Sequence, residues 1–214
     1  MAQCRITEIF YSLQGETKTV GLPTVFVRLT GCPLRCVYCD TAYAFDGGDK
    51  MTLSEIVQKV NHYRPRYITV TGGEPLAQKH CRSLLTLLAD TGAQVSLETS
   101  GAISIEDIDP RISIVMDIKT PSSGEVARNQ YTNVAYLKYS DQVKFVIADK
   151  SDYHWACQKL TELQLTTRCE EILFSPVHGQ CDPAALAQWI IDDNLPVRMQ
   201  IQLHKYLWGE EKGR

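Results

Sequence analysis

Short apolar runs rich in β-branched residues alternate along the chain with segments whose apolar residues recur every three or four positions. The first pattern is typical of buried strands and the second of amphipathic helices. We predict strands at residues 24–30, 67–71, 94–99, 112–119, 142–147, 172–176 and 197–203. Helices are predicted at residues 52–63, 79–89, 152–165 and 183–192.

This alternation predicts an α/β fold. The helix at 52–63 begins with a capping-box pattern, in which Thr52 is followed three residues later by Glu55. Strands that alternate with helices form βαβ units around a parallel sheet. About six units are fewer than a closed eight-unit barrel needs. We therefore favour an incomplete (partial) β/α barrel of about six βα units over a doubly wound sheet. Residues 120–129, which contain Pro, Ser and Gly, are expected to form a mobile loop.

The composition is that of an ordinary globular protein. The chain has 214 residues, of which 44% are hydrophobic and 22% charged, so we expect a single domain over residues 1–214. A formal net charge of −3 gives no general attraction to nucleic acid. We find no signal-peptide pattern and no apolar run of the length of a membrane span. These features predict a cytoplasmic protein without nucleic-acid or membrane partners.

Three of the eight cysteines lie together in the sequence CPLRCVYCDT, as Cys32, Cys36 and Cys39. In a cytoplasmic chain, clustered thiols are more often ligands than disulfides. A structural zinc site usually has two pairs of ligands, and here a fourth ligand would have to come from His178, His204 or Cys181. Iron–sulfur clusters are normally held by four thiolates. A set of three would leave one iron free to bind another ligand, and the spacing favours this second interpretation.

The CxxxCxxC spacing is the signature of the radical S-adenosylmethionine superfamily, which this chain resembles from end to end. The resemblance implies a 4Fe-4S cluster on the three cysteines, whose open iron chelates S-adenosylmethionine. One electron from the cluster then releases a 5′-deoxyadenosyl radical. Tyr38 would lie against the adenine. The sequence TGGEP at 71–75 is similar to a second superfamily motif, in which Glu74 meets the cofactor's amino group, although on its own it would pass as a turn.

Further motifs resemble the 7-carboxy-7-deazaguanine synthase family: IFYSLQGE at 9–16, ETSG at 98–101, VKFV at 143–146 and QLHKYL at 202–207. The resemblance implies a carbon–nitrogen lyase of queuosine (7-deazapurine) biosynthesis. Its reaction would contract 6-carboxy-5,6,7,8-tetrahydropterin to 7-carboxy-7-deazaguanine with loss of ammonia, assisted by Mg²⁺. It also implies a homodimer that is reduced by a flavodoxin or ferredoxin.

The same resemblance implies the residues of the site. The S-adenosylmethionine contacts would be Tyr38, Cys39, Asp40, Gly73, Glu74, Asp117, Ile118, Lys119, Ser175, Pro176, Val177 and His178. The pterin contacts would be Leu13, Gln14, Gly15, Arg28, Thr71 and His204. For Glu16, whose carboxylate matches two N–H donors of a pterin, a role in the site and a role as a solvated loop acid remain open. Thr41 is implied as the Mg²⁺ ligand, and since Mg²⁺ prefers several oxygen ligands, the substrate carboxylate would have to share the metal. For Lys144, a role in the site and a role as a flanking charge remain open.

Two departures from the family pattern affect these assignments. The chain has Asp117-Ile118-Lys119 where other members have Ser-Pro-Lys. It also continues beyond HKYL through residues 208–214, whereas some members end nearby and use the terminal carboxylate to close the pocket. The alternatives are a glycyl-radical enzyme activase of the same superfamily and a zinc-binding interaction module.

Overall fold

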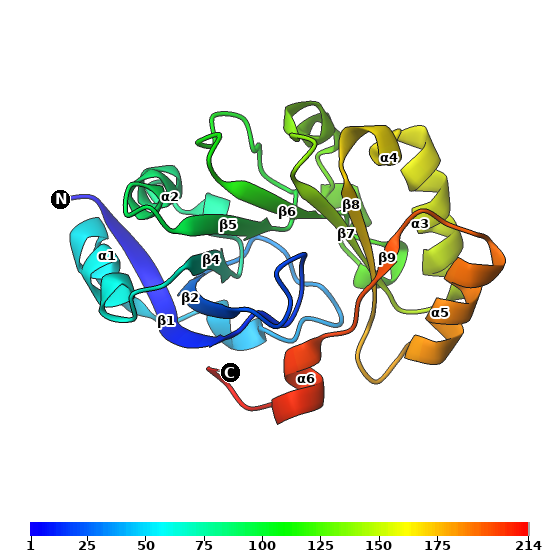
Figure 1. Cartoon of the computed structure of the whole chain (residues 1–214), viewed down its shortest axis with the longest axis horizontal. Helices are drawn as coiled ribbons and strands as arrows, with labels where there is room; N and C mark the ends of the chain where they lie inside the picture. The colour runs from blue at the N-terminus through cyan, green and yellow to red at the C-terminus, as the bar shows by residue number, and fades with distance from the viewer. Residues whose placement is uncertain (214) are drawn as a thin grey trace.

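The structure, a computed structural model, describes residues 1–213 and contains one open nine-stranded sheet within them (Figure 1). The strand order is β3-β1-β2-β4-β5-β6-β7-β8-β9. From β2 onward all neighbours are parallel, whereas β1 pairs antiparallel with both β2 and β3. The bounds are β1 Gln3–Leu13, β2 Pro23–Leu29, β3 Asp49–Thr52, β4 Tyr67–Gly72, β5 Gln94–Thr99, β6 Ser113–Asp117, β7 Gln142–Ile147, β8 Glu171–Pro176 and β9 Arg198–Met199.

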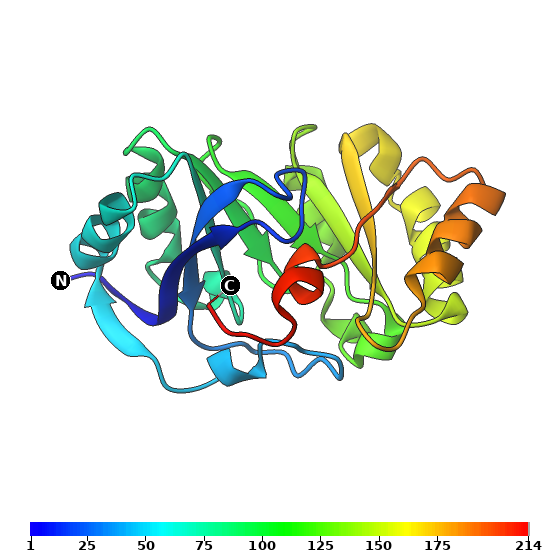
Figure 2. The same ribbon diagram turned by 60° about the horizontal axis from the view of Figure 1, so that its bottom comes forward.

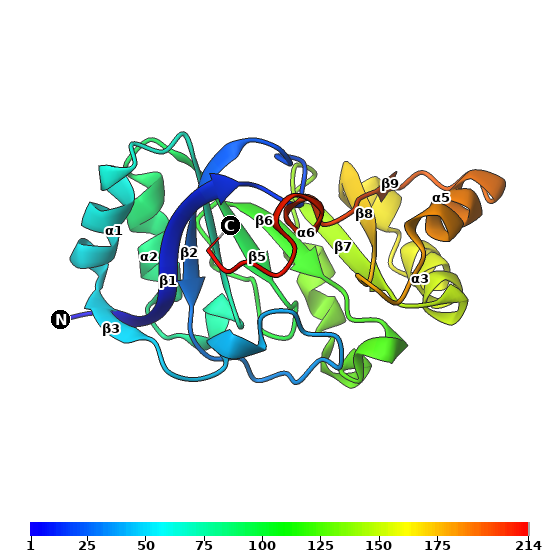
Figure 3. The same ribbon diagram turned by 90° about the horizontal axis from the view of Figure 1, so that it is seen from below.

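Helices cover the outside of this curved sheet, while α6 lies apart from them on its open side, between β1 and β8 (Figures 2 and 3). The sheet therefore forms a partial barrel, which confirms the predicted fold class. The α-helices are α1 Leu53–His62, α2 Cys81–Ala89, α3 Lys150–Glu162, α4 Leu165–Arg168, α5 Pro183–Asp192 and α6 Leu203–Trp208. Short 3₁₀ turns are η1 Ala42–Ala44, η2 Pro75–Ala77, η3 Pro121–Ser123, η4 Val126–Arg128 and η5 Tyr131–Tyr136.

The two faces of the sheet differ because alternate residues of a strand point to opposite sides. In β4, Ile68 and Val70 are buried in the hydrophobic core. The intervening Thr69 instead accepts a hydrogen bond from Gln14 Nε2 at 3.1 Å. This alternation leaves an apolar outer face for the helices and a polar inner face for a site.

Most predicted elements are confirmed, and the capping box at Thr52 is present, with Thr52 Oγ1 accepting from Glu55 N at 3.3 Å and Glu55 accepting from Thr52 N at 2.7 Å. The prediction missed β1 and β3. The last strand was predicted too long, because the chain leaves the sheet at Gln200, whose side chain bonds both backbone groups of Thr17. The expected loop at 120–129 contains η3 and η4 instead, and hydrogen bonds tie it to its surroundings.

No helix among residues 1–213 is both long enough and apolar enough to cross a membrane.

Candidate functional site

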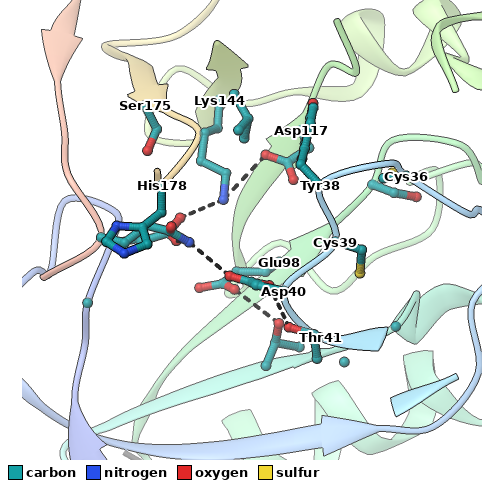
Figure 4. Close-up of a pocket in the computed structure, with 18 of the residues that line it drawn as sticks. Cys36, Tyr38, Cys39, Asp40, Thr41, Glu98, Asp117, Lys144, Ser175 and His178 are labelled. Carbon is teal, nitrogen blue, oxygen red and sulfur yellow. Dashed lines mark hydrogen bonds and ion pairs between the residues drawn. The ribbon is translucent and has the colours of Figure 1, made fainter. Parts of the chain in front are cut away.

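A cavity of about 510 Å³ opens on the concave face of the sheet. Six parallel strands each contribute at least one polar side chain to its wall, and all of these but Lys144 belong to the last two residues of their strand. Figure 4 labels four of them, Glu98, Asp117, Lys144 and Ser175. The cavity thus lies at the carboxyl ends of the strands, where α/β folds place their sites. These residues are Arg28 of β2, Thr71 of β4, Glu98 and Thr99 of β5, Asp117 of β6, Lys144 of β7 and Ser175 of β8.

The loop after β2 brings Cys32, Cys36 and Cys39 to one wall of this cavity, and all three are free thiols. Burial is the main cause that raises the pKa of each thiol. The thiol of Cys39 adds to the rise in pKa of the other two. Lys119 opposes the rise at all three and so favours their thiolate forms.

The cysteine loop is held from two sides. The backbone N–H of Val37 donates to Ser123 O at 3.0 Å, and that of Arg35 donates to Glu125 Oε1 at 2.5 Å, so the segment around η3 anchors the loop. On the other side, the loop contacts Gly73 so closely that a Cβ there would lie 2.3 Å from the carbonyl oxygen of Gly31. A residue without a side chain is therefore required at position 73.

The donor set of the cysteine loop consists of three thiols. Within residues 1–213, no group of three or more His, Cys, Asp or Glu side chains is arranged to hold one ion. A closed zinc site would need four ligands around one point. Three thiols that share a cavity wall fit a 4Fe-4S cluster with one iron open toward the cavity.

A chain of polar contacts crosses the cavity and centres on Glu16. The amide of Gln202 donates to Glu16 Oε1 at 2.9 Å and to Asp40 Oδ2 at 3.0 Å. Lys144 Nζ donates to Glu16 Oε2 at 2.6 Å and lies 3.5 Å from Asp117 Oδ1. Both oxygens of Glu16 therefore have a partner, and the cysteine loop, the β1–β2 loop and the C-terminal segment are connected.

Arg28 is held from behind by a carboxylate. Its Nε donates to Glu8 Oε1 at 2.7 Å, and the hydroxyl of Tyr43 donates to the same oxygen at 2.8 Å. The guanidinium lies 5.9 Å from the ring centroids of both Phe10 and Tyr43. Because Arg28 lines the cavity while its Nε is occupied, its terminal amino groups are the part suited to pair with an anionic ligand.

Glu98 forms a second acidic point on the inner face. Thr71 Oγ1 donates to Glu98 Oε2 at 3.0 Å, and Gln14 Nε2 donates to Glu98 Oε1 at 3.3 Å. Burial raises the pKa of Glu98 above its usual range, although Lys144 opposes this. A partly desolvated carboxylate of this kind can accept hydrogen bonds from ligand N–H groups.

His204, at the start of α6, packs against the β1–β2 loop. The backbone N–H of Leu203 donates to Gly15 O at 3.0 Å. A Cβ on Gly15 would lie 2.2 Å from His204 Nδ1, so only glycine fits at position 15. Burial lowers the pKa of His204 below its usual value, which favours the neutral imidazole.

The structure brings most of the predicted site residues to this cavity. The predicted residues that line it are Leu13, Gln14, Gly15, Glu16, Arg28, Cys32, Cys36, Tyr38, Cys39, Asp40, Thr41, Thr71, Gly73, Asp117, Lys119, Ser175, Val177, His178 and His204. Glu74, Ile118 and Pro176 are buried and do not line the cavity. Glu74 is occupied by hydrogen bonds from Leu76 N at 2.9 Å, Ser100 N at 2.6 Å and the hydroxyls of Thr99 and Ser100, so it supports the turn after β4.

Several lining residues were absent from the predicted site: Glu98, Gln202, Lys205 and Glu210. Lys144, whose role was left open, also lines the cavity. Glu98 and Gln202 lie within the quoted motifs ETSG and QLHKYL, and their position in those motifs could have pointed to them. Nothing in the sequence indicates Glu210, which reaches the cavity because the tail turns back after α6 and pairs with Lys205 Nζ at 2.6 Å.

The chain is similar to known proteins over its whole length. Residues 26–119 match the Radical SAM superfamily model. The 7-carboxy-7-deazaguanine synthase of Chlorobaculum tepidum is 43% identical over 98% of this chain and 96% of the relative's length. That of Methanospirillum hungatei is 44% identical over 95% and 85%. The crystal structure of QueE from Escherichia coli has a TM-score of 0.74 at 22% identity, covers 94% of this chain and 95% of that one, and supports the fold.

Proposed function

The chain belongs to the 7-carboxy-7-deazaguanine synthases of the radical SAM superfamily, and we infer that it is the enzyme that forms 7-carboxy-7-deazaguanine. The single observation that carries this beyond the sequence match is the cavity itself. Its lining combines three cysteines with Arg28, Glu16 and Glu98. Such a site can hold a cluster beside a small anionic heterocycle with several N–H groups.

The cofactors are a 4Fe-4S cluster on Cys32, Cys36 and Cys39 and S-adenosylmethionine on the open iron. When bound, they supply the 5′-deoxyadenosyl radical, and the protein positions and shields it. Tyr38, Asp117 and Lys119 line the same cavity as the cysteines, and these residues would bind the nucleoside and amino-acid parts of the cofactor. Residues 1–214 are taken as a single radical SAM domain.

The substrate is a pterin, 6-carboxy-5,6,7,8-tetrahydropterin, which loses ammonia as its ring contracts. The terminal amino groups of Arg28 pair with its carboxylate, since a guanidinium and a carboxylate fit each other at two points. Glu16 and Glu98 accept hydrogen bonds from the N–H groups of the heterocycle. His204, next to Gly15, packs at the side of the substrate.

Mg²⁺ would bind at Thr41. Thr41 lines the cavity, and its hydroxyl donates a hydrogen bond to Asp40 Oδ1 at 2.8 Å. Two oxygen atoms that could act as metal ligands are therefore adjacent. These residues fit a hard cation only in part, because Mg²⁺ usually takes six oxygen ligands. The substrate carboxylate and water would complete the shell, and Mg²⁺ binding would then depend on the pterin.

The wider setting of the reaction completes the proposal. A flavodoxin or ferredoxin supplies the electron, and two copies of the chain form a homodimer in the cytoplasm. The product enters queuosine or another 7-deazapurine. These partners rest on the family resemblance.

Anaerobic turnover tests the proposed function. The reconstituted protein is mixed with S-adenosylmethionine, Mg²⁺, a reductant and 6-carboxy-5,6,7,8-tetrahydropterin, and the products are followed by mass spectrometry. We expect 7-carboxy-7-deazaguanine from the wild type and none from Cys36→Ala. Formation of 5′-deoxyadenosine alone would support the radical chemistry but refute the assignment of the pterin as substrate. That result is expected of a glycyl-radical activase. A folded protein that binds no iron would favour the alternative in which the cysteines bind zinc.

A further inference from the structure

Lys144 lies between two parts of the cavity. It projects from β7 toward the inner face, and its side chain is only 12% exposed. Figure 4 shows it pointing toward Asp117, its register partner on β6. On the other side is Glu16, from the loop between β1 and β2, a segment far away in sequence. One ammonium group therefore contacts both the loop that faces the pterin and the strand end beside the cysteine loop.

The two contacts of Lys144 are unequal. Its Nζ is 2.6 Å from Glu16 Oε2 and 3.5 Å from Asp117 Oδ1. Asp117 Oδ1 is buried and has no hydrogen-bond partner among residues 1–213, whereas Asp117 Oδ2 accepts from Lys119 at 2.8 Å. The carboxylate of Asp117 is thus held by a hydrogen bond at Oδ2 only, and Oδ1 can still accept a hydrogen bond.

The side chain of Lys144 is positively charged. Burial alone would lower the pKa of this lysine, but the carboxylates of Asp117, Glu16 and Glu98 outweigh it and raise the pKa well above its usual value. The lysine therefore stays protonated. What can change is its distance from Glu16 and from Asp117. A shift of about 0.7 Å would bring it to the ~2.8 Å of a charge-assisted hydrogen bond with Asp117.

We propose that Lys144 is a positioning residue that couples the binding of the pterin to the binding of S-adenosylmethionine. A pterin N–H that donates to Glu16 weakens the pull of that carboxylate on the ammonium. Lys144 then moves toward Asp117 Oδ1 and fixes both oxygens of Asp117, which prepares that carboxylate for the hydroxyl groups of the cofactor. This inference rests on the proposed function, because it requires the pterin at Glu16 and the cofactor at Asp117.

Binding measurements without turnover test the coupling. The holoenzyme with its oxidised cluster is given no reductant, and 6-carboxypterin serves as the pterin probe. The dissociation constant of S-adenosylmethionine is measured by equilibrium dialysis with and without that probe. For the wild type we expect a decrease of about fivefold or more when the probe is present. For Lys144→Met the ratio should fall below about twofold, while Lys159→Met, the same change in an ion pair outside the cavity, should keep the wild-type ratio.

A second variant tests the direction of the effect and does not depend on the folding of Lys144→Met. Glu16→Gln removes the charge that draws Lys144 away from Asp117, so this variant should bind S-adenosylmethionine more tightly than the wild type when no pterin is present. Equal coupling in Lys144→Met and the wild type, or no gain in Glu16→Gln, would overturn the proposal. A wild type that binds both ligands without coupling refutes this inference alone. A wild type that binds the cofactor but no pterin refutes the proposed function as well.

Discussion

The replacement Gly15→Ala tests the contact between the β1–β2 loop and α6 without changing any charge. The added Cβ would lie 2.2 Å from His204 Nδ1, 3.0 Å from its Cγ and 3.2 Å from its Cβ. Non-bonded heavy atoms normally stay about 3.5–4.0 Å apart. The imidazole must therefore move by more than about 1 Å, and the backbone cannot easily retreat because Leu203 N is bonded to Gly15 O.

The magnitudes follow from this overlap. Overpacking of this kind costs about 1–3 kcal/mol of unfolding free energy. For a chain of this length that corresponds to a fall in melting temperature of about 2–12 °C. A displacement of about 1 Å next to the substrate can also reduce turnover by about 10²-fold. Thermal unfolding and the rate of product formation measure the two effects.

A double-mutant cycle with His204→Ala decides whether the overlap is the cause. That substitution removes the ring atoms at 2.2 and 3.0 Å, so adding Gly15→Ala to it should cost less than about 0.5 kcal/mol. The reasoning is refuted if Gly15→Ala costs the same in both backgrounds, or if it alone leaves stability and turnover at wild-type levels.

Three further variants test other parts of the structure. Glu74→Gln should lower the unfolding free energy by about 3 kcal/mol, because an amide N–H₂ would then face donors of Ser100. Chemical denaturation of this variant and of Glu170→Gln, a change at an exposed acid, measures the loss. Equal unfolding free energies for the two variants would contradict the prediction. Thr52→Ala should lower the melting temperature by about 2–4 °C through the loss of about 1 kcal/mol of helix capping, whereas Thr52→Ser should not; a loss in both would point to another cause. Because burial lowers the pKa of His204 from its usual 6.5, the unfolded chain binds that proton more readily, and stability is lost as the pH falls below that value. As the pH falls from about 7.5 to 5.5, the melting temperature of the wild type should therefore fall relative to that of His204→Gln. His62→Gln, a change at an exposed histidine, is the control. A constant difference between the wild type and His204→Gln would contradict the burial of His204.

The parallel part of the fold could be predicted because its strands are short runs rich in β-branched residues that end near polar residues. β4 and β7 are buried along most of their length, so that signal is present in the chain itself. The first strand could not be found in this way. β1 is antiparallel and partly exposed over most of its length, and its mixture of apolar and charged residues has no clear period. β3 has only four residues, and pairing with β1 rather than local sequence defines it.

The site divides along a similar line. The cysteines and Gly73 could be recognised because their chemistry or lack of a side chain is needed at fixed spacing. The partners of Glu16 could not, since Gln202 and Lys144 lie 186 and 128 residues away and meet it only through the fold. The role of Glu74 in supporting the turn after β4 was also hidden, because it depends on Thr99 and Ser100 of a neighbouring segment.

The most direct test of the central claim is the stoichiometry of a single anaerobic reaction with 6-carboxy-5,6,7,8-tetrahydropterin. Product, ammonia and 5′-deoxyadenosine are quantified together by mass spectrometry and an ammonia assay. The family resemblance implies that S-adenosylmethionine is regenerated at each turnover. The account therefore predicts equal amounts of 7-carboxy-7-deazaguanine and ammonia, in excess over 5′-deoxyadenosine, and none of the three from Cys36→Ala. Accumulation of 5′-deoxyadenosine with an unchanged pterin would contradict it.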